Sequence, residues 1–209
     1  MLMVLDAGAQ SSFGLEITRT QFVNYNAGML IGSGGISWYR IDREQNTMTS
    51  STVISLVYQL DSRHLFKIGI GRHQNGRKLD VSTYEDLFGG NPLQDFTNVS
   101  VPYEYLQIST SYSHSLPVRK KVFIPLEFGF NCNKRILEKN IFIVGISKYN
   151  FDLTLSTGLD YSITPQLWAG LHGVYNHSIT EYQDKYEQGS LRFRQLGVEV
   201  SIIALFSND

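Results

Sequence analysis

Apolar and polar residues alternate with a period of two through much of this sequence, most clearly in residues 151–163. Every odd position of that segment is Phe, Leu, Tyr, Ile or a single Thr, and every even position is Asp, Ser, Thr or Gly. A period of two is typical of a β-strand with two different faces. This run is long for a strand of a soluble protein, whereas a strand that crosses a membrane at a tilt needs about 9–11 residues.

Seven further segments alternate in the same way, although Trp168 and Val174 interrupt one of them and Pro125 lies within another. These segments are residues 13–18, 54–60, 66–71, 106–113, 122–131, 167–177 and 196–206. Longer and shorter connections follow one another between the segments. The longer connections are 21–50, 74–101, 132–148 and 178–190, and the shorter ones are 61–64, 116–119 and 164–166. Membrane barrels of the up-and-down type have this arrangement.

The sequence therefore predicts an all-β fold, an eight-stranded antiparallel up-and-down transmembrane β-barrel. We expect one barrel domain over residues 11–209, in which a bulge could absorb Pro125. Side chains fill a barrel of this size, so an open, porin-like channel is not expected. Aromatic residues near the strand ends are expected to form a girdle at the membrane interfaces. They are Tyr58, Tyr103, Tyr105, Tyr112, Tyr161, Tyr175 and Trp168.

The polar face of these segments distinguishes a membrane barrel from a soluble carrier barrel, whose apolar side chains point inward. Many residues of this face are Gly or Ser, which suit the crowded interior of a narrow barrel. Exposed to lipid, an ionised group in mid-strand would cost on the order of a few kcal/mol. We therefore predict a polar cluster inside the barrel, with basic partners from Arg19, Arg72, Arg192 and Arg194. The cluster consists of Glu16, Lys67, Glu127, Asp160 and Glu199.

Residues 1–10, MLMVLDAGAQ, resemble the end of a secretory signal peptide. Ala7, Gly8 and Ala9 match the small-x-small pattern of a signal-peptidase site, although Asp6 interrupts the apolar stretch and no basic residue precedes it. We expect residues 1–10 to be a residual signal-peptide-like segment, and the alternative is a short apolar start that frays. A signal peptide and a membrane barrel together predict the bacterial outer membrane as the location.

The composition offers little for a metal, cofactor or nucleic-acid site. The formal net charge is -1, which gives no attraction for nucleic acid. Cys132 is the single cysteine of the sequence, so no internal disulfide is possible, and we read it as a small strand residue. The histidines lack zinc-type spacing, and His172 and His177 have opposite strand parity. We expect no cofactor and no metal.

A lipid-A-modifying enzyme is the catalytic alternative, because a Ser–His pair on the outer face of a small barrel could attack lipid. Ser113 and Ser115 share one strand face, however, and His114 lies on the other. The Gly-rich stretch at residues 32–35 lacks the Lys-Ser/Thr of a phosphate loop and is expected to be a flexible loop. We therefore predict that the protein is not an enzyme.

Three stretches make the sequence similar to the PorT-like outer-membrane β-barrel family of Bacteroidetes. Tyr105-Leu106-Gln107-Ile108 resembles the family's YLQIP strand, with Ser109 in place of Pro. Residues 149–152, YNFD, resemble its N-x-F-D motif, and residues 195–206 resemble its closing strand, although three residues follow Phe206 here. The resemblance implies an outer-membrane barrel, and a few family members assist a secretion and gliding apparatus.

The function expected from these observations is that of a non-enzymatic membrane scaffold, assembly or secretion-associated factor. Its long connections, residues 21–50 and 74–101, would contact other outer-membrane or secretion-complex proteins. Outer-membrane lipid and lipopolysaccharide are the other expected partners. The alternatives are a lateral-path transporter or binder of a small apolar ligand, and a soluble eight-stranded carrier.

Overall fold

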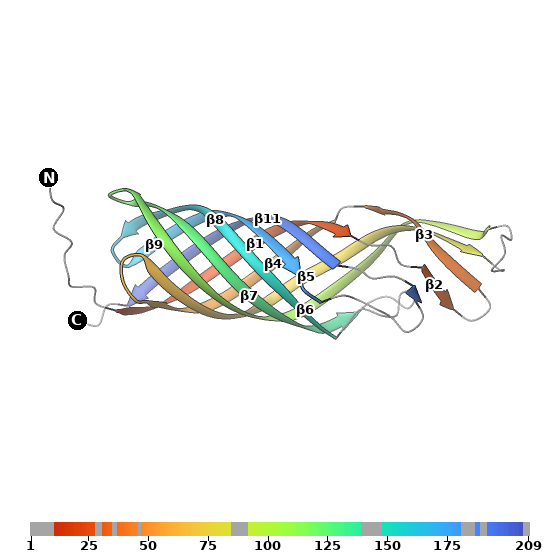
Figure 1. Ribbon diagram of the computed structural model, residues 1–209, viewed down its shortest axis with the longest axis horizontal. Helices are drawn as coiled ribbons and strands as arrows, with labels where there is room; N and C mark the ends of the chain where they lie inside the picture. Colours follow the sequence, from red (N-terminus) through yellow and green to blue (C-terminus); the bar gives the residue numbers. More distant parts are fainter. Residues whose placement is uncertain are drawn as a thin grey trace.

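Eight strands form a closed antiparallel barrel in the computed structural model (Figure 1). The structure describes residues 11–27, 31–34, 37–45, 47–84, 92–138, 148–180, 187–188 and 192–206. The barrel strands are β1 (Ser12–Ala27), β4 (Met48–Gln59), β5 (His64–Tyr84), β6 (Pro92–Arg119), β7 (Val122–Glu138), β8 (Tyr149–Thr164), β9 (Leu167–Ser178) and β11 (Arg192–Phe206). Pairing of β1 with β11 closes the barrel. The predicted fold and strand number are confirmed, and no described helix is long and apolar enough to cross a membrane.

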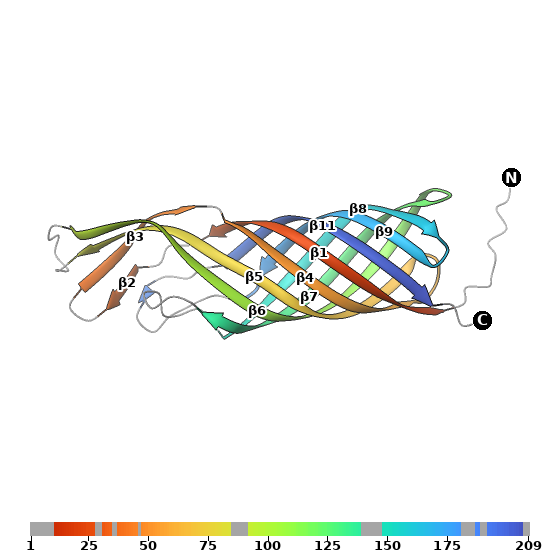
Figure 2. The same cartoon turned by 180° about the vertical axis from the view of Figure 1, so that it is seen from behind.

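The strands are staggered by ten residues around the barrel. A circuit along directly paired residues leaves β1 at Leu15 and returns to β1 at Tyr25. It passes through Leu56, Ile68, Thr110, Phe130, Leu153, His177 and Arg194. A stagger of this size tilts the strands by roughly 40–45° from the barrel axis, as the crossing ribbons of Figure 2 show. The lumen is correspondingly narrow.

The short turns lie at one end of the barrel, with the described ends of β1 and β11 (Figure 1). The turns are residues 60–63, 120–121 and 165–166, close to the predicted ones. Tight turns of outer-membrane barrels lie on the periplasmic side, so we name this the periplasmic end and the opposite one the outer end.

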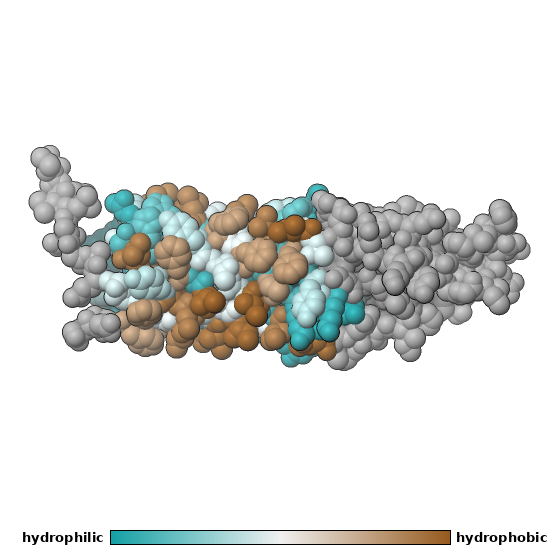
Figure 3. Space-filling view, turned by 60° about the horizontal axis from the view of Figure 1, so that its bottom comes forward, coloured by the Kyte–Doolittle hydropathy of each residue, from teal (hydrophilic) through white to brown (hydrophobic). Residues whose placement is uncertain are grey.

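The outward face of the barrel is apolar and the inward face is polar. Leu155, Val198 and Val200 are more than half exposed, whereas Glu16 is 1% exposed. Hydrophobic side chains cover much of the middle of the barrel in Figure 3. A surface of this kind is suited to hydrocarbon, and it is the inverse of a soluble barrel. The residues that interrupt the alternation, Trp168 and Val174, face the lumen and are buried.

Strand pairing continues well beyond the barrel at the outer end, in a structure that we name the hairpin extension. β5 has 21 residues and β6 has 28, and the two pair as far as Tyr84 and Pro92. β3 (Ser37–Gln45) pairs with β5, β2 (Ile31–Gly34) with β3, and β10 (Glu187–Gln188) with β2. The prediction that 21–50 and 74–101 are loops is wrong for most of these residues. Apolar and polar residues alternate in these strands only over short runs, such as Leu79 and Val81 between Lys78, Asp80 and Ser82, which are a weaker strand signal than the barrel segments.

Pro125 lies within β7 without a bulge, because Phe123–Asp160 and Leu126–Thr157 keep one register on either side of it. The β7–β8 ladder has no paired residues at Ile124 and Pro125, as expected for a residue without an N–H.

The prediction of an aromatic girdle is wrong for three of its seven residues. Tyr103 and Tyr105 are 0% exposed and Trp168 is 7% exposed, so all three lie inside the barrel. Tyr112 and Tyr161 do lie on the outward face. Nearness to a strand end did not distinguish the two groups, because the parity of each residue decides which face it joins. Residues 1–10, with the expected signal-peptide-like segment, lie outside the described residues.

Candidate functional site

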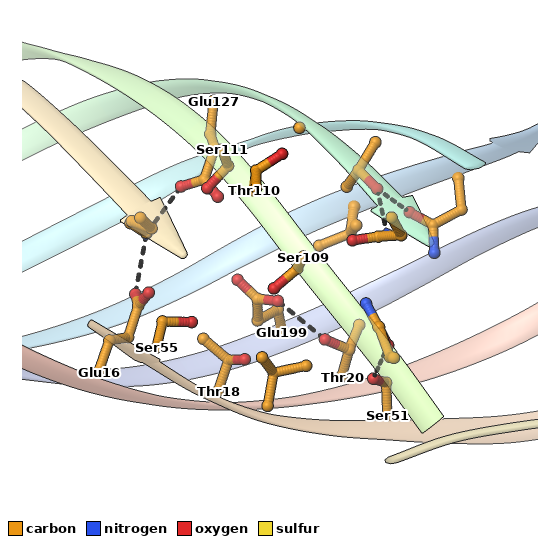
Figure 4. A pocket seen from close by; sticks show the side chains of 18 of the residues that line it. Glu16, Thr18, Thr20, Ser51, Ser55, Ser109, Thr110, Ser111, Glu127 and Glu199 are labelled. Atoms are coloured by element: carbon orange, nitrogen blue, oxygen red, sulfur yellow. Dashed lines mark hydrogen bonds and ion pairs between the residues drawn. The ribbon is translucent and has the colours of Figure 1, made fainter. Parts of the chain in front are cut away.

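The lysine cluster consists of Lys67 on β5 with Glu16 on β1 and Glu127 on β7. The Lys67 ammonium donates to Glu16 Oε1 at 2.9 Å and to Glu127 Oε2 at 2.7 Å. The three side chains are 7%, 1% and 15% exposed. Neither glutamate lies on a strand next to β5, so Lys67 joins opposite parts of the wall across the lumen. Figure 4 shows Glu16 and Glu127 on the two sides, each with a dashed line toward the interior. Enclosure of this kind is tolerated only because the charges are paired.

The histidine cluster is the second ionic group of the lumen. His172 on β9 lies 2.8 Å from Asp160 Oδ1 through Nε2 and 3.3 Å from Glu199 Oε1 through Nδ1. Thr20 donates a hydrogen bond of 2.8 Å to the other oxygen of Glu199. Because carboxylates occupy both ring nitrogens, neither nitrogen is left to activate a serine as a base.

The basic partners differ from those predicted. Arg19 and Arg194 are exposed on the outward face, and Arg72 pairs there with Glu104. The side chain of Arg192 lies outside the described part of the structure. His172 supplies the second base instead of an arginine. Its inward parity was visible in the sequence, but its carboxylate partners come from β8 and β11 and were not.

A cavity of about 60 Å³ lies in the lumen, beside the lysine cluster and Glu199. Its lining includes Glu16, Lys67, Glu127 and Glu199 together with hydroxyl and amide side chains. Figure 4 shows Ser55, Thr18 and Ser109 beside these carboxylates. A polar cavity of this size has room for a few water molecules, and it is too small for a lipid or a drug-sized ligand.

An apolar plug fills the periplasmic end of the lumen. Trp168 stacks on Phe123 with ring centroids 5.0 Å apart and an interplanar angle of 12°. Its indole N–H donates to the carbonyl of Pro165 in the adjacent turn at 3.3 Å. The plug consists of Phe123 with Val57, Leu65, Trp168, Ile203 and Leu205. Close packing of such residues excludes water and ions from this end of the barrel.

An amide layer occupies the lumen on the other side of the charges, toward the outer end. Asn24 donates to Asn75 at 2.7 Å, and Gln195 donates to Asn24 at 2.7 Å. Asn133 and Asn150 donate to the two oxygens of Asp152 at 2.6 and 2.8 Å. The residues of these bonds come from five of the eight barrel strands, β1, β5, β7, β8 and β11. Plug, ion pairs and amide layer together fill most of the described barrel interior.

The structure separates the residues of the Ser–His hypothesis. Ser113 and Ser115 are buried in the lumen, whereas His114 lies on the outward face beside His64. Ser178 is likewise buried and donates to Asn150 at 2.6 Å, while His177 contacts Tyr175 on the same strand. No serine of either segment is positioned to transfer a proton to its neighbouring histidine.

The remaining candidates carry no chemistry that the described residues reveal. Gly32, Ser33 and Gly34 belong to β2, a strand, so the expected flexible loop is wrong for these residues. Cys132 is a free, half-buried cysteine. Among the described side chains, no group of three His, Cys, Asp or Glu residues is placed to hold a metal ion.

No protein-family model matches the chain, and no curated protein matches it. Among solved structures, it is similar to Neisserial surface protein A, with a TM-score of 0.59 and 14% identity over 94% of this chain and 99% of that one. It is also similar to the outer membrane protein OprG of Pseudomonas aeruginosa, with a TM-score of 0.52 and 9% identity over 92% of this chain and 96% of that one. The fold and the apolar outward face together place the chain among the small eight-stranded β-barrels of the bacterial outer membrane.

Proposed function

We propose that this protein is a non-enzymatic outer-membrane scaffold, an assembly or secretion-associated factor that holds a partner protein at its hairpin extension. The observation that carries the proposal is a sheet edge on that extension that no described strand covers. β6 pairs with β5 as far as Pro92, but its ladder with β7 begins at Tyr103. Among the described residues, no strand pairs with the other side of β6 between these two positions.

An open edge presents unpaired backbone N–H and C=O groups, to which an extended segment of another protein can add as a further strand. Proteins commonly block such edges with prolines and charged residues, especially lysines. The β6 edge, residues 92–102, contains no lysine or arginine; Asp95 is its single charged residue, and its prolines, Pro92 and Pro102, lie at its two ends. The part between the prolines is therefore suited to strand addition. The resemblance to PorT-like barrels favours a component of a secretion apparatus as the partner.

The filled lumen supports an anchoring role for the barrel. An open pore is disfavoured because the apolar plug, the two ionic clusters and the amide layer occupy the described interior. A path for a small apolar ligand is disfavoured by the carboxylates that line the central cavity. What the barrel contributes is a rigid base for the strands outside the membrane.

A shortened hairpin tests the proposal. Leu79 pairs with Val99, so residues 80–98 can be replaced by Asn-Gly, a two-residue turn suited to a hairpin. Tagged full-length and shortened proteins are expressed in the native host, cross-linked in the envelope and purified. A heat-dependent shift in gel mobility checks that both barrels are folded. We expect a defined outer-membrane or secretion-complex protein to copurify with the full-length chain and to be lost from the shortened one.

Two results would contradict the proposal. The first is recovery of the same partners by both proteins. The second is recovery of none by the full-length chain, with normal secretion in a strain that lacks the gene.

A further inference from the structure

A polar patch interrupts the apolar outward face on β1, β4 and β5. Arg19, Thr52 and Arg72 stand opposite one another in consecutive ladders. In the next row toward the outer end, Gln21 pairs with Ser50, and Ser50 donates a hydrogen bond of 3.1 Å to Gln74. We name these residues the belt patch: Arg19, Gln21, Ser50, Thr52, Arg72 and Gln74.

Apolar residues border the belt patch on its periplasmic side and on β11, whereas Glu104 adjoins it on β6, so the patch lies at the margin of the lipid-facing surface. Ile17, Ile54 and Ile70 form the row directly on its periplasmic side, and each is more than half exposed. Met48, which is 74% exposed, lies on its outer side, and Val198 of β11 lies opposite Gln21. Hydrocarbon around the patch would leave its charges unsolvated, which is costly. A polar ligand at this position would remove that cost.

The charge of the patch selects an anion. Arg19 is exposed and has no ion pair among the described residues, and Arg72 pairs with Glu104 while its side chain stays 59% exposed. Two arginines and one glutamate leave one net positive charge. Thr52, Ser50 and the amides add neutral hydrogen-bond donors. Guanidinium groups bind phosphate through two parallel hydrogen bonds, and long arginine side chains can extend toward the membrane interface.

We propose that the belt patch binds a phosphate group of lipid A, the membrane anchor of lipopolysaccharide, with acyl chains on the row Ile17, Ile54 and Ile70. The patch lies toward the outer end of the barrel, where β1 continues toward the hairpin extension (Figure 2). Its position therefore matches the leaflet that contains lipid A. The proposal depends on the outer-membrane location and not on the scaffold role, so the two can fail separately.

Native mass spectrometry of the full-length protein in detergent tests this proposal. The protein is titrated with bis-phosphorylated lipid A and, separately, with lipid A from which both phosphates have been removed. Arg19→Gln removes the unpaired guanidinium and leaves the Arg72–Glu104 pair intact. Lys120→Gln is the matched control, because Lys120 is an exposed cation in the turn between β6 and β7, at the periplasmic end of the barrel. We expect Arg19→Gln to weaken binding of phosphorylated lipid A at least tenfold and Lys120→Gln to leave it unchanged.

The wild-type comparison needs no variant, and we expect it to favour the phosphorylated lipid by a similar factor. Equal binding of both lipids by the wild type would overturn the proposal, because the acyl chains alone would then explain association. Equal weakening by both variants would overturn it as well, since that indicates general attraction between charges. A wild-type dimer that Arg19→Gln dissociates, without a change in lipid binding, would assign the patch to contacts between copies of the chain.

Discussion

Lys67 Nζ lies 2.9 Å from Glu16 Oε1, although β5 and β1 are not neighbours in the barrel wall. The same ammonium binds Glu127 on the other side, so one cation compensates two enclosed carboxylates. The lumen thus depends on contacts between residues 51 and 60 positions apart in the sequence.

We expect Lys67→Met to lower the free energy of unfolding by about 3–5 kcal/mol, because loss of one partner leaves the others enclosed without compensation. Urea unfolding in lipid vesicles measures this change. The triple variant with Glu16→Gln and Glu127→Gln is expected to recover much of the loss. A single variant within about 1 kcal/mol of the wild type would show that the pairs contribute little.

Two glycines of β9 provide a matched pair of substitutions. A Cβ on Gly170 would lie 2.5 Å from Asp160 Oδ1 and 2.7 Å from His172 Nε2, and so would push the histidine cluster apart. A Cβ on Gly173 would find its nearest neighbour at 3.8 Å. We expect Gly170→Ala to cost about 1–3 kcal/mol of unfolding free energy and Gly173→Ala to change it by less than about 1 kcal/mol. Equal effects of the two substitutions in the same unfolding assay would contradict this account of the lumen.

The apolar plug is tested by Trp168→Ala. Loss of the indole removes the stack on Phe123 and leaves a cavity, so we expect a loss of about 3–5 kcal/mol in unfolding free energy. Leu171→Ala is the comparison, because Leu171 lies on the outward face of the same strand and is 56% exposed. We expect this substitution to lower the unfolding free energy by less, because lipid can refill the vacated space. A smaller loss of unfolding free energy for Trp168→Ala than for Leu171→Ala would contradict a stabilising role of the plug.

Asp61 gives a pH-dependent prediction for the turn between β4 and β5. Hydrogen bonds from the backbone N–H groups of Arg63 and His64, at 2.7 and 2.9 Å, hold the pKa of Asp61 below its ordinary value of 3.8. A lowered folded-state pKa means that the charge stabilises the fold above 3.8, and that this contribution is lost as the pH falls through the folded-state pKa.

Asp61→Asn keeps a side-chain oxygen and removes the charge. We therefore expect the variant to be less stable than the wild type at neutral pH and as stable as the wild type at about pH 2. Denaturant unfolding at a series of pH values checks this. A difference that does not shrink with acidification would mean that the charge is not its cause.

The interior shows what sequence reasoning could and could not reach. Strand parity alone placed Glu16, Lys67 and Asp160 on the enclosed face, where the structure has them. Parity could not pair them, because partners on strands that are not adjacent meet only after the barrel has closed. For the same reason His172 was not identified as a counter-ion. Arginines were expected as partners from charge alone, although the parity of Arg19 and Arg194 directs them outward.

The hairpin extension was missed for a different reason. Apolar and polar residues alternate in it only over short runs, such as Leu79 and Val81 between Lys78, Asp80 and Ser82. Such short runs are a weaker strand signal than the long alternation of the barrel segments. Backbone hydrogen bonds pair β5 with β6 and β3, and no single segment specifies those partners.

The sequence by itself determined the eight barrel strands, their order and the character of each face, because alternation is a local property that the solvent on each side imposes. The tertiary structure alone decided which side chains meet in the lumen. That choice depends on the ten-residue stagger between Leu15 and Tyr25, which accumulates over the whole circuit of strands and is encoded in no single segment.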